Sequence, residues 1–397
     1  MDHDEIFDVI VVGGGPAGAT AAHDLAERGH KVALLDKAGR IKPCGGAIPP
    51  RLIRDFDIPA SLLKAQVSVA TMVSPKGVSV DMPIEGGFVG MVDRKEFDEW
   101  LRDRAARSGA QRFTGSFESL TRGSDGLPIV HFAPKDPSLD AQTLKGRIVV
   151  GADGANSAVA RQEVRGSKRG KFVFAYHEIV EAPVDAATGA PDGRCEIYYR
   201  GTLSPDFYAW IFPHGDTMSV GSGSAHKGFS LKTSVRTLRE ETGLGDVGTL
   251  RREGAPIPLK PLPRWDNGRD VVLAGDAAGV VAPASGEGIY YAMLGGRLAA
   301  EAAELAIAKG DARALKLARK RFMKEHGRVF WILGLMQRVW YVNDKRRERF
   351  VSICRDKNVQ RLTWEAYMNK ALPRRDPMAH VRIFFKDLAH LLRIVPP

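Results

Sequence analysis

The segment that decides the fold is "FDVIVVGGGPAGATAAHDLAERGHKVALLDK", residues 7–37. It has the pattern of an apolar strand, a glycine turn, an alanine-rich helix and a second strand that ends in an acid. In a G-x-G-x-x-G turn the glycines let a pyrophosphate approach the helix N-terminus, and the acid can bind a ribose hydroxyl. A purely structural glycine turn does not account for that acid. The segment predicts a dinucleotide site at Gly13, Gly15, Ala17, Gly18, Asp36 and Lys37.

Two later segments also run from a strand into a polar turn and then a helix. In "RIVVGADGANSAVAR", residues 147–161, the strand leads into Asp153 and Gly154. In "DVVLAGDAAGVVAPASGEGIYYAMLGGRLAAEAAELA", residues 270–306, it leads into Gly275 and Asp276, and a long helix follows. Apart from these three motifs, Arg94 in "VDRKEFDEWL" lies at the expected start of another helix.

Charge is unevenly distributed along the 397 residues, whose net charge is +11. From Lys309 onward there are 22 Lys and Arg but only eight Asp and Glu, so residues 1–308 carry a net charge of −3. A basic tail of this kind suits an anionic surface, either a membrane or a nucleic acid. We find no nucleic-acid motif beside it and expect a membrane contact.

Targeting and metal signals are lacking in the sequence. The N-terminus opens acidic, without the basic region of a signal peptide, and no charge-free apolar run reaches about 18 residues. Cys44, Cys195 and Cys354 are far apart and odd in number, which argues against a disulfide framework or a zinc site. We therefore expect a cytoplasmic protein with no metal.

In their order and separation, the three motifs resemble the two-dinucleotide flavoprotein fold that aromatic hydroxylases share. The resemblance implies a Rossmann-like α/β fold with an α+β substrate domain and FAD as the cofactor. It implies that the first motif binds the ADP part of FAD, that Asp276 contacts the ribityl chain, and that Asp153 and Gly154 serve both FAD and the nicotinamide donor. Arg94 would lie near the flavin; the alternative is a surface charge at a helix N-terminus. The further positions that it implies for the cofactor are Gly275, Gly286, Gly288 and Ile289.

The same resemblance predicts discontinuous domains. We expect the FAD-binding domain to comprise residues 1–60, 95–165 and 265–310. A mainly antiparallel substrate domain would take residues 61–94 and 166–264, and residues 311–397 would form a helical C-terminal region.

Two stretches narrow the function. "IKPCGGAIPP", residues 41–50, places Cys44 before two glycines. "SPDFYAWIFPHGDTMSVGSG", residues 204–223, has Tyr208, Trp210 and Phe212 at alternate positions, which a strand would turn to one face. On spacing alone the aromatic residues fit a sheet core, and Cys44 fits a small buried side chain in a turn.

Together these stretches resemble the geranylgeranyl reductase family, over nearly the whole chain. The ending "RRDPMAHVRIFFKDLA" is most similar to the branch that acts on bacteriochlorophyll in phototrophic bacteria. One departure is His214, where many members have lysine. The resemblance implies that Cys44 lies at the reactive face of the flavin, as a proton donor or as part of the pocket wall. It also implies flavin contacts at Gly45, Gly46 and Ala47, and a prenyl-binding strand at Tyr208, Trp210, Phe212 and Pro213.

The implied reaction is the stepwise reduction of the geranylgeranyl tail of a bacteriochlorophyll to phytyl, with NADPH as the reductant of FAD. Such a pigment would be collected at the inner, photosynthetic membrane, where the basic tail would make a peripheral contact. Two alternatives remain open at this point. One is the reduction of free geranylgeranyl diphosphate, and the other is a flavin-dependent aromatic hydroxylase.

Overall fold

The chain folds into two compact units, each assembled from three separate segments. The computed structural model describes residues 5–37, 41, 42, 44–167, 170–183 and 193–370. The first unit comprises residues 1–41, 95–172 and 256–330, and the second comprises residues 42–94, 173–255 and 331–397. The structure thus assigns residues 42–60 to the second unit and residues 166–172, 256–264 and 311–330 to the first, unlike the expected boundaries. The C-terminal ending used for the family resemblance lies outside the described residues.

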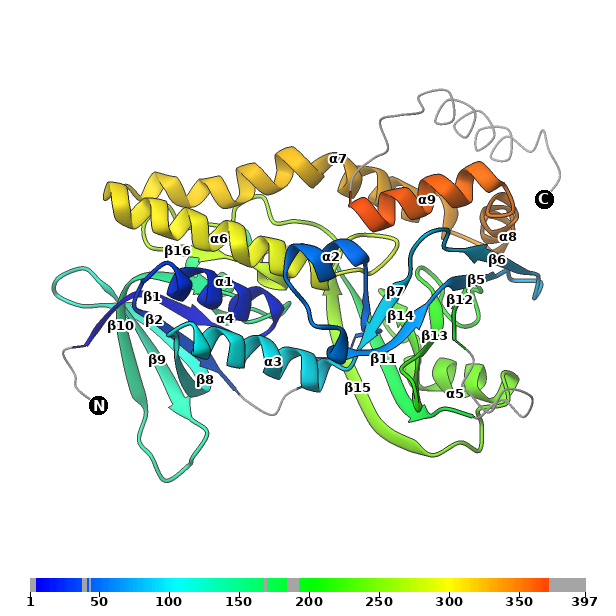
Figure 1. Cartoon of the computed structure of the whole chain (residues 1–397), viewed down its shortest axis with the longest axis horizontal. Coiled ribbons are helices and arrows are strands. Elements are labelled where there is room, and N and C mark those ends of the chain that lie inside the picture. The colour runs from blue at the N-terminus through cyan, green and yellow to red at the C-terminus, as the bar shows by residue number, and fades with distance from the viewer. Residues whose placement is uncertain (1–4, 38–40, 43, 168–169, 184–192, 371–397) are drawn as a thin grey trace. The chain divides into compact units, whose positions relative to one another are not determined.

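A parallel sheet forms the centre of the first unit (Figure 1). Strand β1 pairs with β2 on one side and with β10 on the other, β8 follows β2, and β16 follows β10, all parallel. Strand β9 pairs antiparallel with both β8 and β10. The strands are β1 (Ile6–Val12), β2 (Val32–Asp36), β8 (Gln111–Arg122), β9 (Pro128–Pro134), β10 (Gln142–Gly151) and β16 (Val271–Leu273).

Helices of the first unit pack against this sheet through small residues. Helix α1 begins directly after the glycine turn and is alanine-rich, so α6 can approach it closely. The helical elements are α1 (Pro16–Glu27), α3 (Arg94–Arg107), α4 (Ala158–Glu163), η3 (Gly275–Ala278), α6 (Ile289–Lys309), η4 (Ala312–Leu315) and the first part of α7 (Lys316–Trp340). The strand, helix and strand predicted for the first motif are confirmed.

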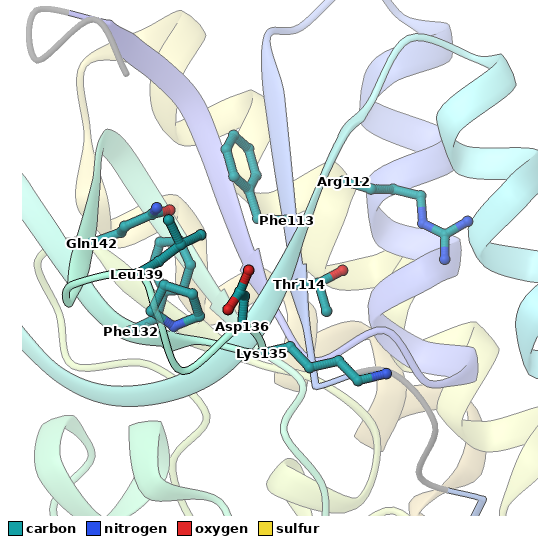
Figure 2. A pocket seen from close by; sticks show the side chains of 9 residues that line it. Arg112, Phe113, Thr114, Phe132, Lys135, Asp136, Leu139 and Gln142 are labelled. Atoms are coloured by element: carbon teal, nitrogen blue, oxygen red, sulfur yellow. The ribbon is translucent and has the colours of Figure 1, made fainter.

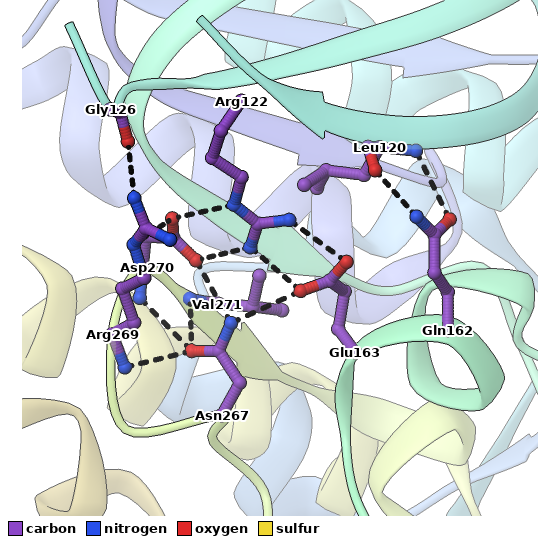
Figure 3. A network of polar contacts seen from close by, with 9 residues as sticks. All are labelled: Leu120, Arg122, Gly126, Gln162, Glu163, Asn267, Arg269, Asp270 and Val271. Atoms are coloured by element: carbon purple, nitrogen blue, oxygen red, sulfur yellow. Dashed lines mark hydrogen bonds and ion pairs between the residues drawn. The ribbon is translucent and has the colours of Figure 1, made fainter. Parts of the chain in front are cut away.

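A cluster of charges joins three distant parts of the first unit (Figure 3). Arg122 at the end of β8 donates to both Glu163 of α4 and Asp270, which directly precedes β16. Asn267 donates to the same two carboxylates. The ion pairs are largely buried, and they raise the pKa of Arg122 further above its ordinary value. The cluster therefore fixes the strand that leads into Gly275.

The second unit contains a seven-stranded sheet in the order β15-β11-β14-β13-β12-β5-β6. Strands β11 and β14, β14 and β13, β13 and β12, and β5 and β6 pair antiparallel, whereas β12 and β5 pair parallel. A smaller sheet has the order β3-β7-β4. The strands are β3 (Ala47–Ile48), β4 (Leu63–Val67), β5 (Val69–Val73), β6 (Ser79–Pro83), β7 (Val89–Val92), β11 (Phe172–Glu181), β12 (Arg194–Tyr198), β13 (Ala209–Pro213), β14 (Thr217–Ser224) and β15 (Thr249–Pro258).

Helix α5 covers one face of the large sheet with Val235 and Leu238, which pack in a buried cluster with Ile211 and Val220. The helical elements are α2 (Pro50–Asp55), η1 (Ala60–Leu62), α5 (Leu231–Glu241), the end of α7, α8 (Asp344–Ile353) and α9 (Lys357–Asn369). Of the helices that the structure describes, none combines the length and the apolar character needed to cross a bilayer.

Candidate active site

The first glycine turn is packed on two sides and open at Gly15. A Cβ added to Gly18 would lie 1.8 Å from the carbonyl oxygen of Gly13, and one added to Gly13 would lie 2.3 Å from that of Ala152. A Cβ on Gly15 would meet no atom of the described residues within 4 Å. Gly15 is also the N-cap of α1, and among these residues no side chain caps that helix end. Open space beside uncapped N–H groups fits the pyrophosphate of a dinucleotide.

Asp36 ends β2 and faces the same turn. Its Oδ2 accepts a hydrogen bond from the Gly14 N–H at 2.8 Å. Arg102 of α3 donates to the Gly14 carbonyl at 3.1 Å, and its Nη1 lies 3.7 Å from Asp36 Oδ1. Arg102 is buried, and sequence reasoning missed it because its helix is charged throughout. The carboxylate is therefore held beside the glycine turn, and its contact with a ribose remains a prediction.

Small residues bring the motif around residue 275 against the first one. Gly275 has a φ of 62°, and a Cβ there would lie 2.6 Å from the Cβ of Ala17. A Cβ on Gly296 of α6 would lie 2.1 Å from the Ala17 carbonyl oxygen. Asp276 is buried in η3, and a Cβ on Gly288, the N-cap of α6, would lie 3.9 Å from its Oδ1. The acid of this motif thus faces a second helix N-terminus.

Asp153 has a structural task that the sequence analysis did not foresee. Its carboxylate accepts hydrogen bonds from the Ser157 hydroxyl and from the N–H groups of Ala158 and Val159, so it caps α4. Burial raises the pKa of Asp153, and these hydrogen bonds oppose that rise. Gly154, next to it, has a φ of 86° and open space beside its Cα. A contact of Asp153 with a cofactor remains a prediction.

The other predicted cofactor residues of this group are placed as follows. Lys37 is exposed after β2, Gly286 lies in the turn before α6 with a φ of 66°, and Ile289 is the buried first residue of α6. Arg94 begins α3 and is only 4% exposed, which contradicts the alternative of a surface charge.

In the second unit, residues 44–46 form a turn that we call the cysteine–glycine turn. The Gly46 N–H points to Cys44 Sγ at 3.5 Å, and Gly46 has a φ of 71°. The Gly46 carbonyl accepts a hydrogen bond from Val92 of β7 at 2.9 Å, and Ala47 follows in β3. Cys44 is partly exposed, whereas the other two cysteines are buried. Cys44 is therefore the most accessible thiol in the described part of the chain.

The predicted aromatic strand is β13, with Tyr208 directly before it. Tyr208, Trp210 and Phe212 form a row with ring centroids 5.9 and 6.2 Å apart, as alternation predicts. The intervening Ala209 and Ile211 face the buried cluster under α5. The aromatic row therefore lies on the other face of the sheet and does not belong to that core.

The structure brings the cysteine–glycine turn and the aromatic row together within the second unit. A Cβ on Gly45 would lie 2.7 Å from the Phe212 ring and 3.9 Å from Trp210 Nε1. Only a glycine allows the turn to approach the rings this closely. Pro213 ends β13 beside them.

His214 follows Pro213 and faces the same turn. Its Nε2 would lie 2.6 Å from a Cβ on Gly46. Its Nδ1 lies 3.1 Å from the Phe212 carbonyl, which can only accept, so Nδ1 carries the proton. Burial lowers the pKa of His214 to about 4, so the ring is neutral at neutral pH. The position of His214 directly after the aromatic strand is the sequence feature that could have identified it as part of this site.

A separate hollow lies in the first unit, along β8 and β9 (Figure 2). None of the predicted site residues lines it, although Thr114 in its wall is the register partner of Asp36. Its walls combine apolar and charged side chains: Arg112, Phe113, Thr114, Phe132, Pro134, Lys135, Asp136, Leu139 and Gln142. Among the residues that the structure describes, no group of His, Cys, Asp and Glu is arranged to hold a metal.

Comparison with known proteins adds independent evidence. A family model described as an FAD-binding domain matches residues 7–201. A geranylgeranyl diphosphate reductase of Rhodobacter capsulatus is 58% identical over 98% of this chain and 99% of its own length. A protein of the same name from Synechocystis is 35% identical over 98% of both chains.

Solved structures agree with the predicted fold class. A geranylgeranyl bacteriochlorophyll reductase-like protein from Thermoplasma acidophilum superposes with a TM-score of 0.82 at 23% identity, covering 96% of this chain and 99% of the other. A p-nitrophenol 4-monooxygenase from Pseudomonas putida gives 0.67 at 16% identity, covering 91% and 97%. The fold is thus that of FAD-binding proteins of the aromatic-hydroxylase type, and the open glycine turn with its oriented acid fits FAD.

Proposed function

Because this chain belongs to the geranylgeranyl diphosphate reductase family, we propose that it reduces the isolated double bonds of a geranylgeranyl chain, one after another, to phytyl. We propose bacteriochlorophyll as the carrier of that chain and NADPH as the electron donor. Free geranylgeranyl diphosphate, the substrate in the relatives' name, is the alternative carrier.

One observation supports this function most directly. The cysteine–glycine turn packs on the aromatic row through Gly45, so the segment that carries the Cys44 thiol lies against an apolar aromatic wall. A prenyl chain offers no hydrogen-bonding group, and aromatic side chains suit it as a wall. The proposal assigns the wall to Tyr208, Trp210, Phe212 and Pro213, and the proton to Cys44.

The reduction of each double bond requires a hydride at one carbon and a proton at the other. FAD, when bound and reduced, supplies hydride chemistry. The second carbon needs a proton, and an isolated alkene has no carbonyl that could stabilise negative charge while it waits. In this proposal the Cys44 thiol gives its proton to that carbon as the hydride arrives at the other, and a C–H bond forms on each. The Gly46 N–H, aimed at Sγ, stabilises the negative charge left on sulfur until solvent returns a proton.

We propose that a basic and apolar face of α7 contacts the membrane that holds the pigment. Trp331 and Leu335 are 69% and 46% exposed, and Lys324, Arg328 and Arg338 continue the same exposed stripe at helical spacing. Exposed apolar side chains flanked by Lys and Arg are typical of a helix that lies in a bilayer interface.

The test is an anaerobic assay with purified holoenzyme. NADPH should bleach the flavin, and geranylgeranyl bacteriochlorophyll should restore the yellow colour without oxygen. Mass spectrometry should find products two, four and six hydrogens heavier. Faster re-oxidation by geranylgeranyl diphosphate would select the alternative carrier. Re-oxidation that needs oxygen, with an oxygen atom gained by the product, would select a hydroxylase.

A further inference from the structure

A buried line of polar side chains crosses four neighbouring strands and ends at Trp210 of the aromatic row. Glu253 of β15, His177 of β11, Ser219 of β14 and Trp210 of β13 occupy consecutive strands of the large sheet. His177 Nε2 lies 2.8 Å from Glu253 Oε2, and its Nδ1 lies 2.8 Å from Ser219 Oγ. Trp210 Nε1 lies 3.1 Å from the same Ser219 oxygen. His177, Ser219 and Trp210 are at most 5% exposed.

The chemistry of the partners fixes the direction of these hydrogen bonds. An indole N–H can only donate, so Ser219 Oγ accepts from Trp210. The Glu253 carboxylate accepts from the His177 Nε2–H. In the tautomer with the proton on Nε2, Nδ1 is an acceptor, and the Ser219 hydroxyl donates to it. Every group in the line has a partner, and each hydrogen bond runs from Trp210 toward Glu253.

A glycine makes room for this arrangement. Gly221 lies between His177 and Trp210 in the strand register, opposite each of them. A Cβ on Gly221 would lie only 2.1 Å from the six-membered ring of the indole. The indole therefore lies directly over the backbone of β14, where its N–H reaches Ser219. The same N–H edge is the part of Trp210 nearest to Gly45.

Serine, histidine and glutamate in this order also occur in hydrolases, where they activate the serine as a nucleophile. That role does not fit here, because Ser219 is fully buried and its oxygen already accepts the indole N–H. We propose instead that Glu253, His177 and Ser219 are positioning residues that hold the Trp210 indole in one orientation against the cysteine–glycine turn. The prenyl chain then passes Cys44 at one fixed depth during each successive reduction.

This inference rests on the proposed function for its kinetic consequence, but its structural part can be measured separately. The protein has six tryptophans, so incorporation of 5-fluorotryptophan gives six fluorine signals, and Trp210→Phe identifies the one that belongs to Trp210. Ser219→Ala should shift or broaden that signal alone. Ser219→Thr keeps the hydroxyl and should restore it.

Two substitutions of His177 test its hydrogen bond to Ser219 and its hydrogen bond to Glu253 separately. Asparagine can place a polar atom near the Nδ1 position, next to Ser219, whereas glutamine places one near the Nε2 position, next to Glu253. We expect His177→Asn to keep the Trp210 signal closer to that of the wild type than His177→Gln does. Ser108→Ala is the matched control, because it removes a 2.8 Å hydrogen bond between a serine and His23 in the first unit.

The kinetic consequence concerns substrate binding and not flavin reduction. Ser219→Ala and His177→Gln should raise KM about five- to tenfold, as loss of one buried hydrogen bond predicts, and should release more partly reduced chains. The rate at which NADPH bleaches the flavin should stay at the wild-type value. Ser108→Ala should change none of these quantities.

The possible results distinguish the two proposals. If the wild type reduces no geranylgeranyl substrate, the proposed function is wrong, and the fluorine signals still decide the positioning role. If the Ser219→Ala variant has the same Trp210 fluorine signal and the same KM as the Ser108→Ala variant, the positioning role is wrong. Should Ser219→Ala not fold, the two His177 variants decide by the same readouts.

Discussion

At the scale of single residues, Gly15 and Gly18 have opposite surroundings although both belong to one motif. A side chain at Gly15 would project into open space, whereas one at Gly18 would collide with the backbone at Gly13. We expect Gly15→Val to fold with a wild-type melting temperature after FAD is removed from both proteins, but to be purified colourless. Gly18→Val should be insoluble or strongly destabilised. Absorbance at the flavin band and circular dichroism measure the two effects; a yellow, fully loaded Gly15→Val would contradict the cofactor site.

For Cys44, the structure supports a test that separates the two half-reactions. Cys44→Ser should slow alkene reduction by about 100-fold or more, the usual contribution of a positioned general acid. It should leave flavin reduction by NADPH unchanged, because that step needs no proton at the alkene. Stopped-flow absorbance measures both rates. Equal losses in the two steps would assign Cys44 a structural role in its turn.

His214 predicts a dependence of stability on pH. Burial lowers its pKa in the folded state to about 4, against 6.5 for an ordinary histidine. Between pH 6.5 and pH 4 the unfolded chain binds a proton at His214 that the folded chain does not bind. The free energy of unfolding is therefore at its full value above pH 6.5 and decreases as the pH falls toward 4. The shift corresponds to about 3 kcal/mol. Urea titrations of wild type and His214→Gln at pH 7 and pH 4.5 should therefore show a smaller loss of stability in the variant; equal losses would contradict the buried neutral ring.

At the scale of elements, the exposed stripe of α7 makes the membrane contact testable without truncation. Removing the chain after Lys309 would delete Phe322 and Phe330, which are buried in the first unit, so point substitutions are the better test. Changing Lys324, Arg328 and Arg338 to Gln should weaken binding to anionic liposomes by on the order of 100-fold, since each basic residue contributes about 1 kcal/mol.

Sedimentation with anionic liposomes measures this binding, which should also fall with rising salt. Trp331→Ser combined with Leu335→Ser should release the protein at all salt concentrations. Leu139→Ser is the control, because Leu139 is an apolar residue that is 51% exposed and does not belong to α7. Binding that depends on neither salt nor these substitutions would show that α7 is not the contact. The basic tail also contains Phe384 and Phe385, which lie outside the described residues.

The elements differ in how far the sequence predicts them. The first motif is local: strand, turn, helix and acid follow within 31 residues, and the structure has each of them. The alternation of Tyr208, Trp210 and Phe212 likewise fixes one face of β13. The polar partners of that face could not be predicted, because Ser219 and Glu253 meet His177 across 42 and 76 residues. Pairing at such separations is set by strand order, which the local pattern does not contain.

At the scale of the whole molecule, the Arg122 cluster connects segments that only the complete first unit brings together. Arg122→Leu would remove the ion pair of the largely buried Glu163 and leave the buried Asp270 with only the exposed Arg269 at 3.5 Å, which should destabilise the protein by about 3 kcal/mol. Arg112→Leu is the matched control, because its ion pairs with Glu99 and Asp103 are exposed and should contribute less than about 1 kcal/mol. Urea titrations followed by circular dichroism measure both; similar losses would mean that the cluster does not stabilise the unit.

The interleaving of the two units has a consequence for synthesis on the ribosome. When residue 255 has been made, both units still lack a segment, and β10 still lacks β16, its parallel partner in the finished sheet. An unpaired strand edge of apolar sequence readily joins edges of other chains. The first unit can therefore not finish folding before residues 256–330 have been made, and the second not before residues 331–397. We expect the nascent chain to depend on chaperones, and slower translation to be of little benefit because the missing strand comes late.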